Sequence, residues 1–314
     1  MSLGPRAVFG MPAYNRPDAL PRALESLLSQ TYTNFGLVIV DDAPSPEVEA
    51  IIASYADPRI VYEPNPNRLG MVGNWRKAFD RGRALFPGAD YFAWVSDHDM
   101  WHPRWLEVLI GVLDANVDVV GAYPLMQRVF PNHRRTMTRR FDTSELGHPV
   151  ERLRAAIKRM TAGNCVYGLF RADALAKAGV FRPVLAPDRH VLMQLLLLGR
   201  FAHVPEVLWY REVAGVFSYS RQRRMFFPTH VPLHTYLPMV VQHSGLMLWE
   251  FGIKGRGLPS IGRFEGARYG MAHLWYASLH ELLRNDSRWR LALDSAFGRR
   301  SRNAGAKRPS PVSG

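Results

Sequence analysis

The stretch Phe92-Ala-Trp-Val-Ser-Asp-His-Asp-Met-Trp101 decides how the chain is interpreted, because it joins a buried strand to a pair of carboxylates. Residues 91–95 form a short apolar run of aromatic and β-branched side chains, which is typical of a fully buried strand. Asp97 and Asp99 follow directly, and a helical pattern starts at Pro103. Because open α/β sheets bind ligands at the carboxyl ends of their strands, these carboxylates are predicted to face a ligand.

The carboxylate pair has two interpretations on this stretch alone. Two neighbouring carboxylates repel each other, and a hard divalent cation relieves that repulsion, with phosphate oxygens and water completing its coordination. This interpretation predicts a metal–diphosphate site at Asp97 and Asp99. The alternative is a solvated turn in which Asp99 helps to start the next helix, and these residues alone favour neither interpretation.

Length, composition and charge describe a globular chain with an excess of positive charge. The 314 residues are 47% hydrophobic and 21% charged, which suits one large domain or a domain with a smaller extension. The net charge of +13 favours anionic partners such as nucleotide phosphates, acidic lipid surfaces or nucleic acid. Part of it lies in residues 298–314, a polar stretch rich in Pro, Gly and Ser that we expect to be disordered.

Cysteine usage and hydropathy favour a cytoplasmic protein. Cys165 has no second cysteine to pair with, which suits a reducing compartment. The N-terminal residues do not show the charged and apolar regions of a signal peptide, and no apolar run approaches the ~20 residues that span a bilayer. We expect a cytoplasmic location, with peripheral contact at the inner face of the membrane as an open alternative.

Strand-like and helical patterns alternate through the first part of the chain. Leu20, Leu24, Leu27 and Leu28, for example, recur on one face of a helix. Strands are predicted at 6–11, 37–40, 60–62, 91–95 and 117–122, and helices at 17–28, 46–55, 72–86 and 103–112. This alternation predicts a doubly wound, mostly parallel α/β sheet.

The second part of the chain has a less regular pattern. Residues 127–149 are rich in arginine and lack periodicity, so we expect a long basic loop with a function. Helices are expected at 150–160, 172–178 and 191–198, a strand at 164–170, and two short strands within 201–210. Beyond residue 217 we expect a helical region, clearest at 267–283.

Motifs of several common enzyme classes are absent from the sequence. It has no G-x-x-x-x-G-K-[ST], and no G-x-G-x-x-G follows the first strand, which removes support for a P-loop NTPase and for a dinucleotide-binding fold. It also lacks G-x-S-x-G, H-E-x-x-H and the second cysteine of a thiolate zinc site.

Four short motifs, taken in order, resemble the glycosyltransferases of family 2, which have the GT-A fold. They are Met11-Pro-Ala-Tyr-Asn-Arg16, Gln30-Thr-Tyr32 leading into Val38-Ile-Val-Asp-Asp42, Asn67-Arg-Leu-Gly70 with Asn74, and Ser96-Asp-His-Asp99. Each motif is unspecific alone, and their order and spacing carry the resemblance. The stretches 164–179, 187–188 and 208–211 match the family more loosely.

The resemblance implies a nucleotide-sugar site at the strand ends. Its donor-binding positions would be Pro12, Tyr14, Asn15, Asp42, Gly70, Asn74, Ser96 and Asp97. Asp42 would accept a hydrogen bond from the base or ribose, and Asp97 and Asp99 would form the D-x-D motif that holds Mn²⁺ or Mg²⁺. Simpler roles stay open: a turn residue at Tyr14, a helix cap at Asp42, and turn and helix-start chemistry at Gly70 and Asn74.

Three positions depart from the family pattern. Gly36 stands where Glu is frequent, Ala43 where Gly is usual, and His98 in a position that is often Asp. Which of Asp97, His98 and Asp99 ligates the metal therefore stays open. Arg16 could contact a phosphate or be solvated, and we favour a solvated side chain.

Asp188 is the predicted catalytic base. It lies in the turn Pro187-Asp-Arg-His190 before an apolar helix, where the resembling family has its base. The alternative is a helix N-cap, a role for which Asp is favoured and which is worth ~1 kcal/mol. Asp173 and Glu212 are the reserve candidates.

The resemblance implies an inverting glycosyltransferase that moves a hexose from a nucleotide-diphosphate sugar to a saccharide, lipid-linked or other hydroxyl acceptor. It divides the chain into a donor-binding half (1–125), an acceptor half (126–216), a helical region (217–297) and a basic tail (298–314). One alternative is a nucleotidyltransferase, which usually has a Gly- and Arg/Lys-rich loop that residues 11–16 lack. Another is a basic module that binds nucleic acid or anionic lipid, which has no need of Asp42, Asp97 and Asp99 at strand ends.

Overall fold

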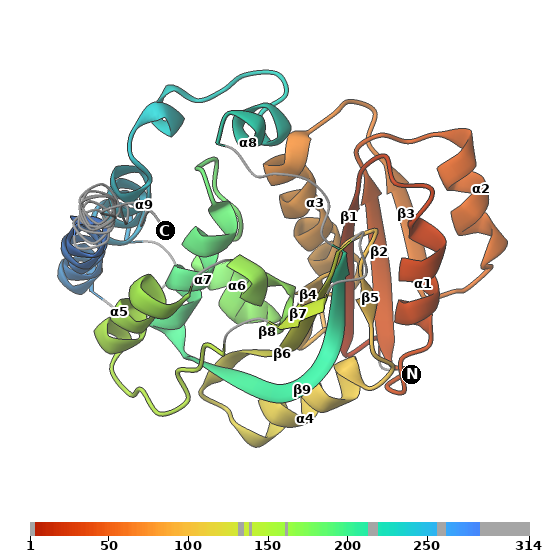
Figure 1. Ribbon diagram of the computed structural model, residues 1–314, viewed down its shortest axis with the longest axis horizontal. Helices are drawn as coiled ribbons and strands as arrows, with labels where there is room; N and C mark the ends of the chain where they lie inside the picture. The colour runs from red at the N-terminus through yellow and green to blue at the C-terminus, as the bar shows by residue number, and fades with distance from the viewer. Residues whose placement is uncertain are drawn as a thin grey trace, which may run out of the picture.

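A mixed nine-stranded sheet runs through the molecule, with helices on both faces (Figure 1). This computed structural model describes residues 4–130, 135–137, 140–160, 163–212, 219–255 and 262–282. The strands are β1 (Ala7–Ala13), β2 (Phe35–Asp41), β3 (Ile60–Pro64), β4 (Tyr91–Trp94), β5 (Met100–Trp101), β6 (Val119–Val129), β7 (Arg135–Met137), β8 (Leu169–Arg171) and β9 (Arg200–Glu212). Their order is β3-β2-β1-β4-β8-β6-β9-β5, and β7 pairs with β6.

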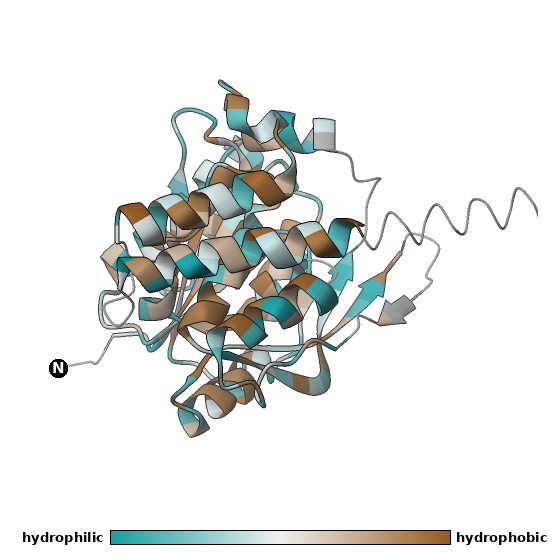
Figure 2. Cartoon of the chain, turned by 90° about the vertical axis from the view of Figure 1, so that its left-hand side faces the viewer, coloured by the Kyte–Doolittle hydropathy of each residue, from teal (hydrophilic) through white to brown (hydrophobic). Residues whose placement is uncertain are grey.

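The α-helices of the described residues alternate with the strands in the first part of the chain. After the last strand, β9, the described residues form further helices. The α-helices of the described residues are α1 (Leu20–Leu28), α2 (Pro46–Ser54), α3 (Gly70–Leu85), α4 (Trp105–Ala115), α5 (Pro149–Arg159), α6 (Ala172–Ala178), α7 (Pro187–Leu198), α8 (Tyr219–Phe226), α9 (Met239–Met247) and a helix over 263–282. Shorter helical turns cover Gly163–Tyr167, Leu233–Tyr236 and Leu248–Ile253. The helices α5, α9 and 263–282 lie together on one side of the molecule (Figures 1 and 2).

The parallel half of the sheet follows the predicted alternation. Strands β3, β2, β1 and β4 are parallel neighbours, and all seven residues of β2 are buried. Alternate residues point to opposite faces, so Val8 packs in the apolar cluster that contains α3, and Phe9 in the cluster that contains α1 and α4. The predicted doubly wound α/β fold is therefore confirmed.

The other half of the sheet makes it mixed rather than mostly parallel. Strand β8 runs antiparallel to both β4 and β6, and β6 and β9 then form a long parallel pair. The sheet is continuous across residue 125, where we expected the donor half to end, because β6 extends to Val129. The four-part division of the chain stays a prediction.

Two predicted strand regions were wrong. Residues 164–170 begin as a 3-10 turn over Gly163–Tyr167, and only Leu169–Arg171 form a strand. Gly168 causes this, because it turns back to Cys165 and lies so close to the Ala122 carbonyl that a Cβ would meet it at 2.5 Å. The expected pair of strands within 201–210 is the single strand β9, which bulges at 205–206 where Pro205 has no N–H for the ladder.

Parts of the expected loop 127–149 form secondary structure. Strand β6 continues to Val129 and pairs with β7, and α5 begins at Pro149. Residues 131–134 and 138–139 of this segment lie outside the described residues, as do residues 283–297 and the basic tail 298–314.

Gly10 and Gly111 provide a matched test of strand packing. A Cβ on Gly10, in the central strand β1, would meet Phe92 Cζ at 2.4 Å, whereas Gly111 on α4 has nothing within 4 Å. Gly10→Ala should lower the free energy of unfolding by about 1–3 kcal/mol through overpacking. Gly111→Ala should raise it by up to about 1 kcal/mol through helix propensity. Urea unfolding of both variants checks the opposite signs, and shifts of the same sign would contradict this packing.

Candidate functional site

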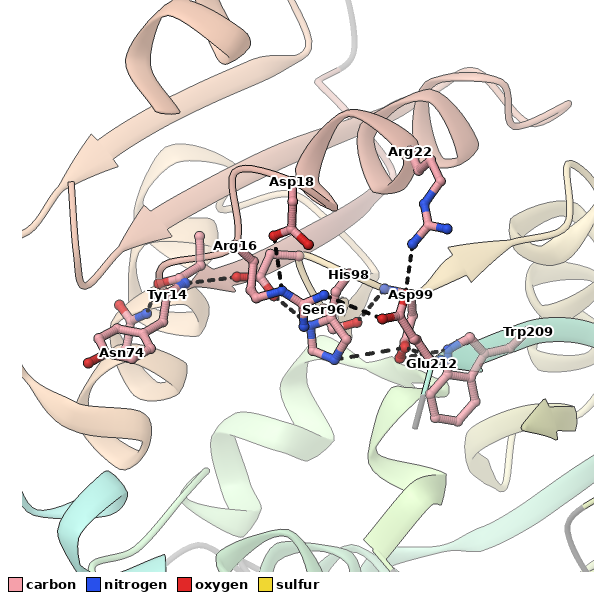
Figure 3. Close-up of polar contacts among 12 residues, drawn as sticks. Tyr14, Arg16, Asp18, Arg22, Asn74, Ser96, His98, Asp99, Trp209 and Glu212 are labelled. Atoms are coloured by element: carbon pink, nitrogen blue, oxygen red, sulfur yellow. Dashed lines mark hydrogen bonds and ion pairs between the residues drawn. The ribbon is translucent and has the colours of Figure 1, made fainter. Parts of the chain in front are cut away.

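The predicted site residues gather where β1, β2 and β4 end. The N–H of Tyr14, just after β1, donates to Asp97 Oδ2 at 2.8 Å, which ties the turn after β1 to the turn after β4 (Figure 3). Parallel strands end at the same edge of a sheet, so residues separated in sequence by 83 positions become neighbours. The predicted proximity of these turns is present in the structure.

His98 lies between the two aspartates. Its Nδ1 is 2.7 Å from Asp97 Oδ1, and its Nε2 is 3.9 Å from Asp99 Oδ1 (Figure 3). Burial opposes the charged form of the imidazole, but the two carboxylates outweigh it and raise the pKa of His98. A positive charge between Asp97 and Asp99 is thus electrostatically favoured.

Asp99 is buried and holds the end of β9. Its Oδ1 accepts from the Glu212 N–H at 3.0 Å and its Oδ2 from Trp209 Nε1 at 3.1 Å. Ser96 Oγ in turn accepts from the Asp99 N–H at 3.1 Å. Desolvation raises the pKa of Asp99 despite these donors. The solvated-turn interpretation of this residue was therefore wrong, because Asp99 is only 1% exposed.

Asp42 binds the N-terminus of α3 and does not cap α2. Its carboxylate accepts from the N–H groups of Leu69 at 2.6 Å and Gly70 at 2.8 Å, and from Asn65 Nδ2 at 3.0 Å. The cap of α2 is Ser45, whose Oγ accepts from the Val48 N–H. The helix-cap alternative for Asp42 was therefore wrong, and its contact with the base or ribose stays a prediction.

Asn74 connects three chain segments. Its Nδ2 donates to the carbonyls of Ala13 and Val40 at 3.2 and 3.0 Å, and its Oδ1 accepts from Asn65 Nδ2 at 3.0 Å. The residue is 2% exposed, and its amide hydrogen bonds go to the chain itself. Its structural role is to join the ends of β1 and β2 to the loop before α3.

Gly70 occupies a position that only glycine suits. Its φ is +73°, and a Cβ would meet Pro228 Cδ at 2.4 Å and the Phe226 carbonyl at 2.5 Å. The turn before α3 thereby packs against the segment after α8. Contact of Gly70 with a nucleotide stays a prediction.

The residues after β1 differ in exposure. Pro12 was expected in the turn, but it is buried within β1, opposite Val40. A proline is tolerated there because β4 ends opposite Gly10, which leaves Pro12 without a strand on that side. Tyr14 is 43% exposed with the Arg68 guanidinium 4.6 Å from its ring, and Asn15 is exposed with φ +51°.

Asp188 lies in the first turn of α7 and does not cap it. The N-cap is Ala186, in left-handed conformation, followed by Pro187 at the first helical position, so the N-cap alternative was wrong. Withdrawal from water raises the pKa of Asp188, although nearby N–H groups and the charge of Arg211 act in the opposite direction. A carboxylate with a raised pKa is suited to accept a proton near neutral pH.

Tyr167 and Arg211 belong to the site although no motif singled out their roles. Burial raises the pKa of Tyr167, the charge of Arg211 lowers it, and the charges of Asp99, Asp188 and Asp97 raise it, so this phenol is electrostatically coupled to all three carboxylates. Arg211 donates to Asn164 Oδ1 and has its guanidinium 5.7 Å from the Tyr167 ring. Its charge lowers the pKa of Asp99 and of Asp188. The pairing with Asn164, 47 residues away, is not visible in the sequence.

The reserve candidates for the base are engaged elsewhere. Glu212 pairs with Arg22 at 2.7 Å and with Arg16 at 3.5 Å (Figure 3). Asp173 is exposed on α6 and pairs with Arg83 at 3.0 Å. Arg16 is half-buried in this network, so the expectation of a solvated arginine was wrong.

The donor set fits a divalent cation that is completed by a ligand. Within the described part of the chain, no three His, Cys, Asp or Glu residues form a metal-binding group. Mg²⁺ commonly has only one or two carboxylates together with phosphate oxygens and water, so such a group is not required. Each carboxylate oxygen of Asp97 and Asp99 takes part in one hydrogen bond, which leaves a lone pair available.

The sequence is similar to glycosyltransferases over its first half. The model of the family described as "Glycosyl transferase family 2" matches residues 9–177. An uncharacterized glycosyltransferase of Rickettsia typhi is 32% identical over 112 residues, which are 35% of this chain and 33% of that protein. The Escherichia coli "UDP-Glc:alpha-D-GlcNAc-diphosphoundecaprenol beta-1,3-glucosyltransferase WfgD" is 28% identical over 34% of this chain and 40% of its own length. The chain thus matches about a third of the length of these curated relatives.

Two solved structures have a similar fold. Staphylococcus aureus TarS aligns with a TM-score of 0.55 and 15% identity over 84% of this chain and 41% of that chain. The mannosyltransferase PcManGT of Pyrobaculum calidifontis was solved in complex with GDP-Man and Mn²⁺. It aligns with a TM-score of 0.54 and 16% identity over 94% of this chain and 81% of that chain. These likenesses confirm the predicted GT-A fold.

Substitution of Asp42 tests its structural role. Asp42→Asn places an amide N–H₂ where the N–H groups of Leu69 and Gly70 require an acceptor. We expect a loss of about 1–3 kcal/mol in the free energy of unfolding. The exposed Asp80→Asn on α3 is the matched control and should leave stability unchanged. Urea unfolding measures both, and equal stabilities would contradict the role of Asp42 in the loop.

Proposed function

Because this chain belongs to glycosyl transferase family 2, we propose that it moves a sugar from a nucleotide-diphosphate donor to an acceptor hydroxyl with inversion. The observation that carries the proposal is the position of Asp97 and Asp99 at the strand ends, with the charge of Asp188 acting on the same phenol, Tyr167. Inverting transfer needs a site for the leaving diphosphate and a base for the acceptor. In this proposal Asp97 and Asp99 provide the site for the diphosphate, and Asp188 is the base.

The donor is bound at the ends of β1, β2 and β4. Asp97 and Asp99 would hold Mn²⁺ or Mg²⁺, which would supply Lewis-acid stabilisation of the leaving diphosphate when bound. The Mn²⁺ and GDP-Man in the complex of the Pyrobaculum neighbour, and the UDP bound to TarS, support a donor of this class. Tyr14 is exposed beside this site, and its ring lies near the nucleotide base in the proposed complex.

Asp188 acts as the general base. Its raised pKa suits it to accept the proton of the attacking hydroxyl, and the Arg211 charge opposes this rise in pKa. The first turn of α7 fixes its position, because Pro187 presets the backbone there.

The acceptor carries a hydroxyl group and is a saccharide or a lipid-linked compound. The name of the WfgD relative contains a diphosphoundecaprenol acceptor, which supports the lipid-linked class. The described residues contain no helix long and apolar enough to cross a membrane. The cytoplasmic location at the inner face of the membrane stays a prediction.

The two alternatives are less well supported. A nucleotidyltransferase would share the sheet and the metal, but the family match favours sugar transfer. A basic module without activity would not explain why a buried Asp99 and a raised Asp188 pKa occur at one site. We therefore propose no role in nucleic acid binding.

Donor binding should depend on the metal through Asp99. Calorimetric titration of UDP and of GDP should give tighter binding in Mn²⁺ than in EDTA, and Asp99→Ala should remove the difference. The exposed Asp80→Ala should keep it. Thermal unfolding confirms that each variant is folded, since Asp99 also holds Trp209 and Glu212. Equal affinities of the wild-type chain in Mn²⁺ and EDTA would exclude the metal role.

Asp188→Asn should keep nucleotide affinity and lose most turnover, by about 10²–10⁴-fold, because Asn does not accept a proton. The acid limb of kcat/KM should lie above the ordinary Asp pKa of about 3.9, since the surroundings raise the pKa of Asp188. Arg211→Gln should move that limb to higher pH, because it removes a charge that lowers this pKa. Activity of Asp188→Asn near wild type would exclude the base role, and retention of anomeric configuration would exclude single displacement.

A further inference from the structure

The helix over 263–282 exposes apolar side chains in a regular pattern. After Arg263, which is also exposed, its exposed residues recur every three or four positions, and only one of these six is polar. They are Phe264, Arg268, Met271, Trp275, Leu279 and Leu282. Phe264 is 80% exposed and Trp275 is 68% exposed. A surface helix of a globular protein normally turns its apolar stripe to the core, so this orientation requires a partner.

A second apolar stripe lies on α9 and the helical turn that follows it. Val241, Gly245, Trp249 and Ile253 are exposed at intervals of four residues. Trp249 is 48% exposed and Ile253 is 60% exposed. None of these four residues has a charged side chain, and three of them are large and apolar, so contact with water does not account for their exposure.

The two stripes belong to neighbouring helices. A Cβ on Gly270 would meet Leu248 Cγ at 2.6 Å, and one on Gly252 would meet Ala267 Cβ at 3.1 Å. Ser244 Oγ is also 2.7 Å from His273 Nδ1. Both helices lie on the side that faces the viewer in Figure 2. We call the exposed residues of both stripes the C-terminal apolar face.

Cations surround the C-terminal apolar face. Lys254 lies 5.3 Å from the Trp249 ring centroid, and Arg263 and Arg268 are exposed on the neighbouring helix. On the other flank, the Arg154 guanidinium of α5 lies 5.3 Å from the Tyr276 ring. The acidic Glu265 is only half-exposed and accepts from the Tyr269 hydroxyl.

We propose that the C-terminal apolar face docks onto an anionic lipid bilayer. An amphipathic surface with Trp, Phe and Leu at its centre and Lys and Arg at its edge lies in the headgroup region, where both parts are satisfied. The described residues contain no helix long and apolar enough to cross a bilayer. This proposal rests on side chains outside the donor site and does not depend on the transfer reaction.

A second copy of the chain is a less suitable occupant. Two-fold pairing brings the same surface patch of two copies together. The cation-rich face of one copy, with Lys254 and Arg268, would then pack against the cation-rich face of the other, and like charges across an interface are unfavourable. Anionic headgroups, by contrast, neutralise these cations.

Vesicle flotation of the full-length chain tests the proposal. The chain should float with phosphatidylcholine vesicles that contain phosphatidylglycerol, and much less with pure phosphatidylcholine. Trp249→Ser with Trp275→Ser should weaken the partition by about tenfold or more, because both rings enter the interface. The matched control, Leu85→Ser with Val117→Ser, removes two exposed apolar side chains elsewhere and should float like wild type. Lys254→Gln with Arg268→Gln should weaken only the binding to anionic vesicles.

Further measurements separate docking through this face from binding by the basic tail and from pairing of two copies. Removal of residues 298–314 isolates the contribution of the basic tail. Absence of flotation, or equal flotation of the Trp249→Ser/Trp275→Ser variant, would overturn the proposal. A lipid-free dimer in sedimentation that this variant dissociates would assign the face to a second copy instead. Thermal unfolding and UDP titration of the same variant should match wild type, so failure of membrane docking is distinguishable from failure of the donor site.

Discussion

Buried carboxylates at the strand ends, and the backbone N–H groups that satisfy them, are the constraint on which the rest of the site depends. Asp42, Asp97 and Asp99 are each at most 6% exposed, and an unsatisfied anion at such depth costs several kcal/mol. Each therefore recruits donors from a distant segment: Asp42 from the start of α3, Asp97 from Tyr14, and Asp99 from the end of β9. The loops around the site have their conformations because these charges must be solvated by protein.

The same arrangement accounts for the chemistry proposed for the site. Asp97 and Asp99 are oriented by protein donors without losing all of their lone pairs, and His98 between them shows that the position favours a cation. Arg211 acts on both parts of the site, since its charge lowers the pKa of Asp99 and of Asp188. The charges of Asp99 and Asp188 likewise both act on Tyr167. Asp97 and Asp99 are thereby suited to bind a cation, and Asp188 is suited to accept a proton.

The parts of the fold that depend on local patterns could be predicted from the sequence. The apolar run 37–40 became the fully buried β2, and Ser45 caps α2 with its own side chain. Features that depend on distant contacts could not be predicted. The turn before β8 follows from the contact of Gly168 with Ala122, and Asp99 meets the Glu212 N–H across 113 residues. Motif order located the site, whereas the partners of each side chain required the fold.

The helix over 263–282 shows why periodicity alone does not assign a face to the core. Its 3.6-residue pattern predicts a helix correctly, but the side that it buries contains only one large aromatic residue, Tyr269, beside Gly266, Gly270, His273 and Ala277, while Phe264 and Trp275 face outward. The small buried residues allow the approach of α9 and its extension, as the contacts of Gly270 with Leu248 show. Burying glycine and histidine while exposing tryptophan and phenylalanine reverses the usual preference in water. The reversal is favourable where the apolar side chains reach the acyl boundary below polar headgroups, which is the physical reason for assigning this side of the molecule to a bilayer.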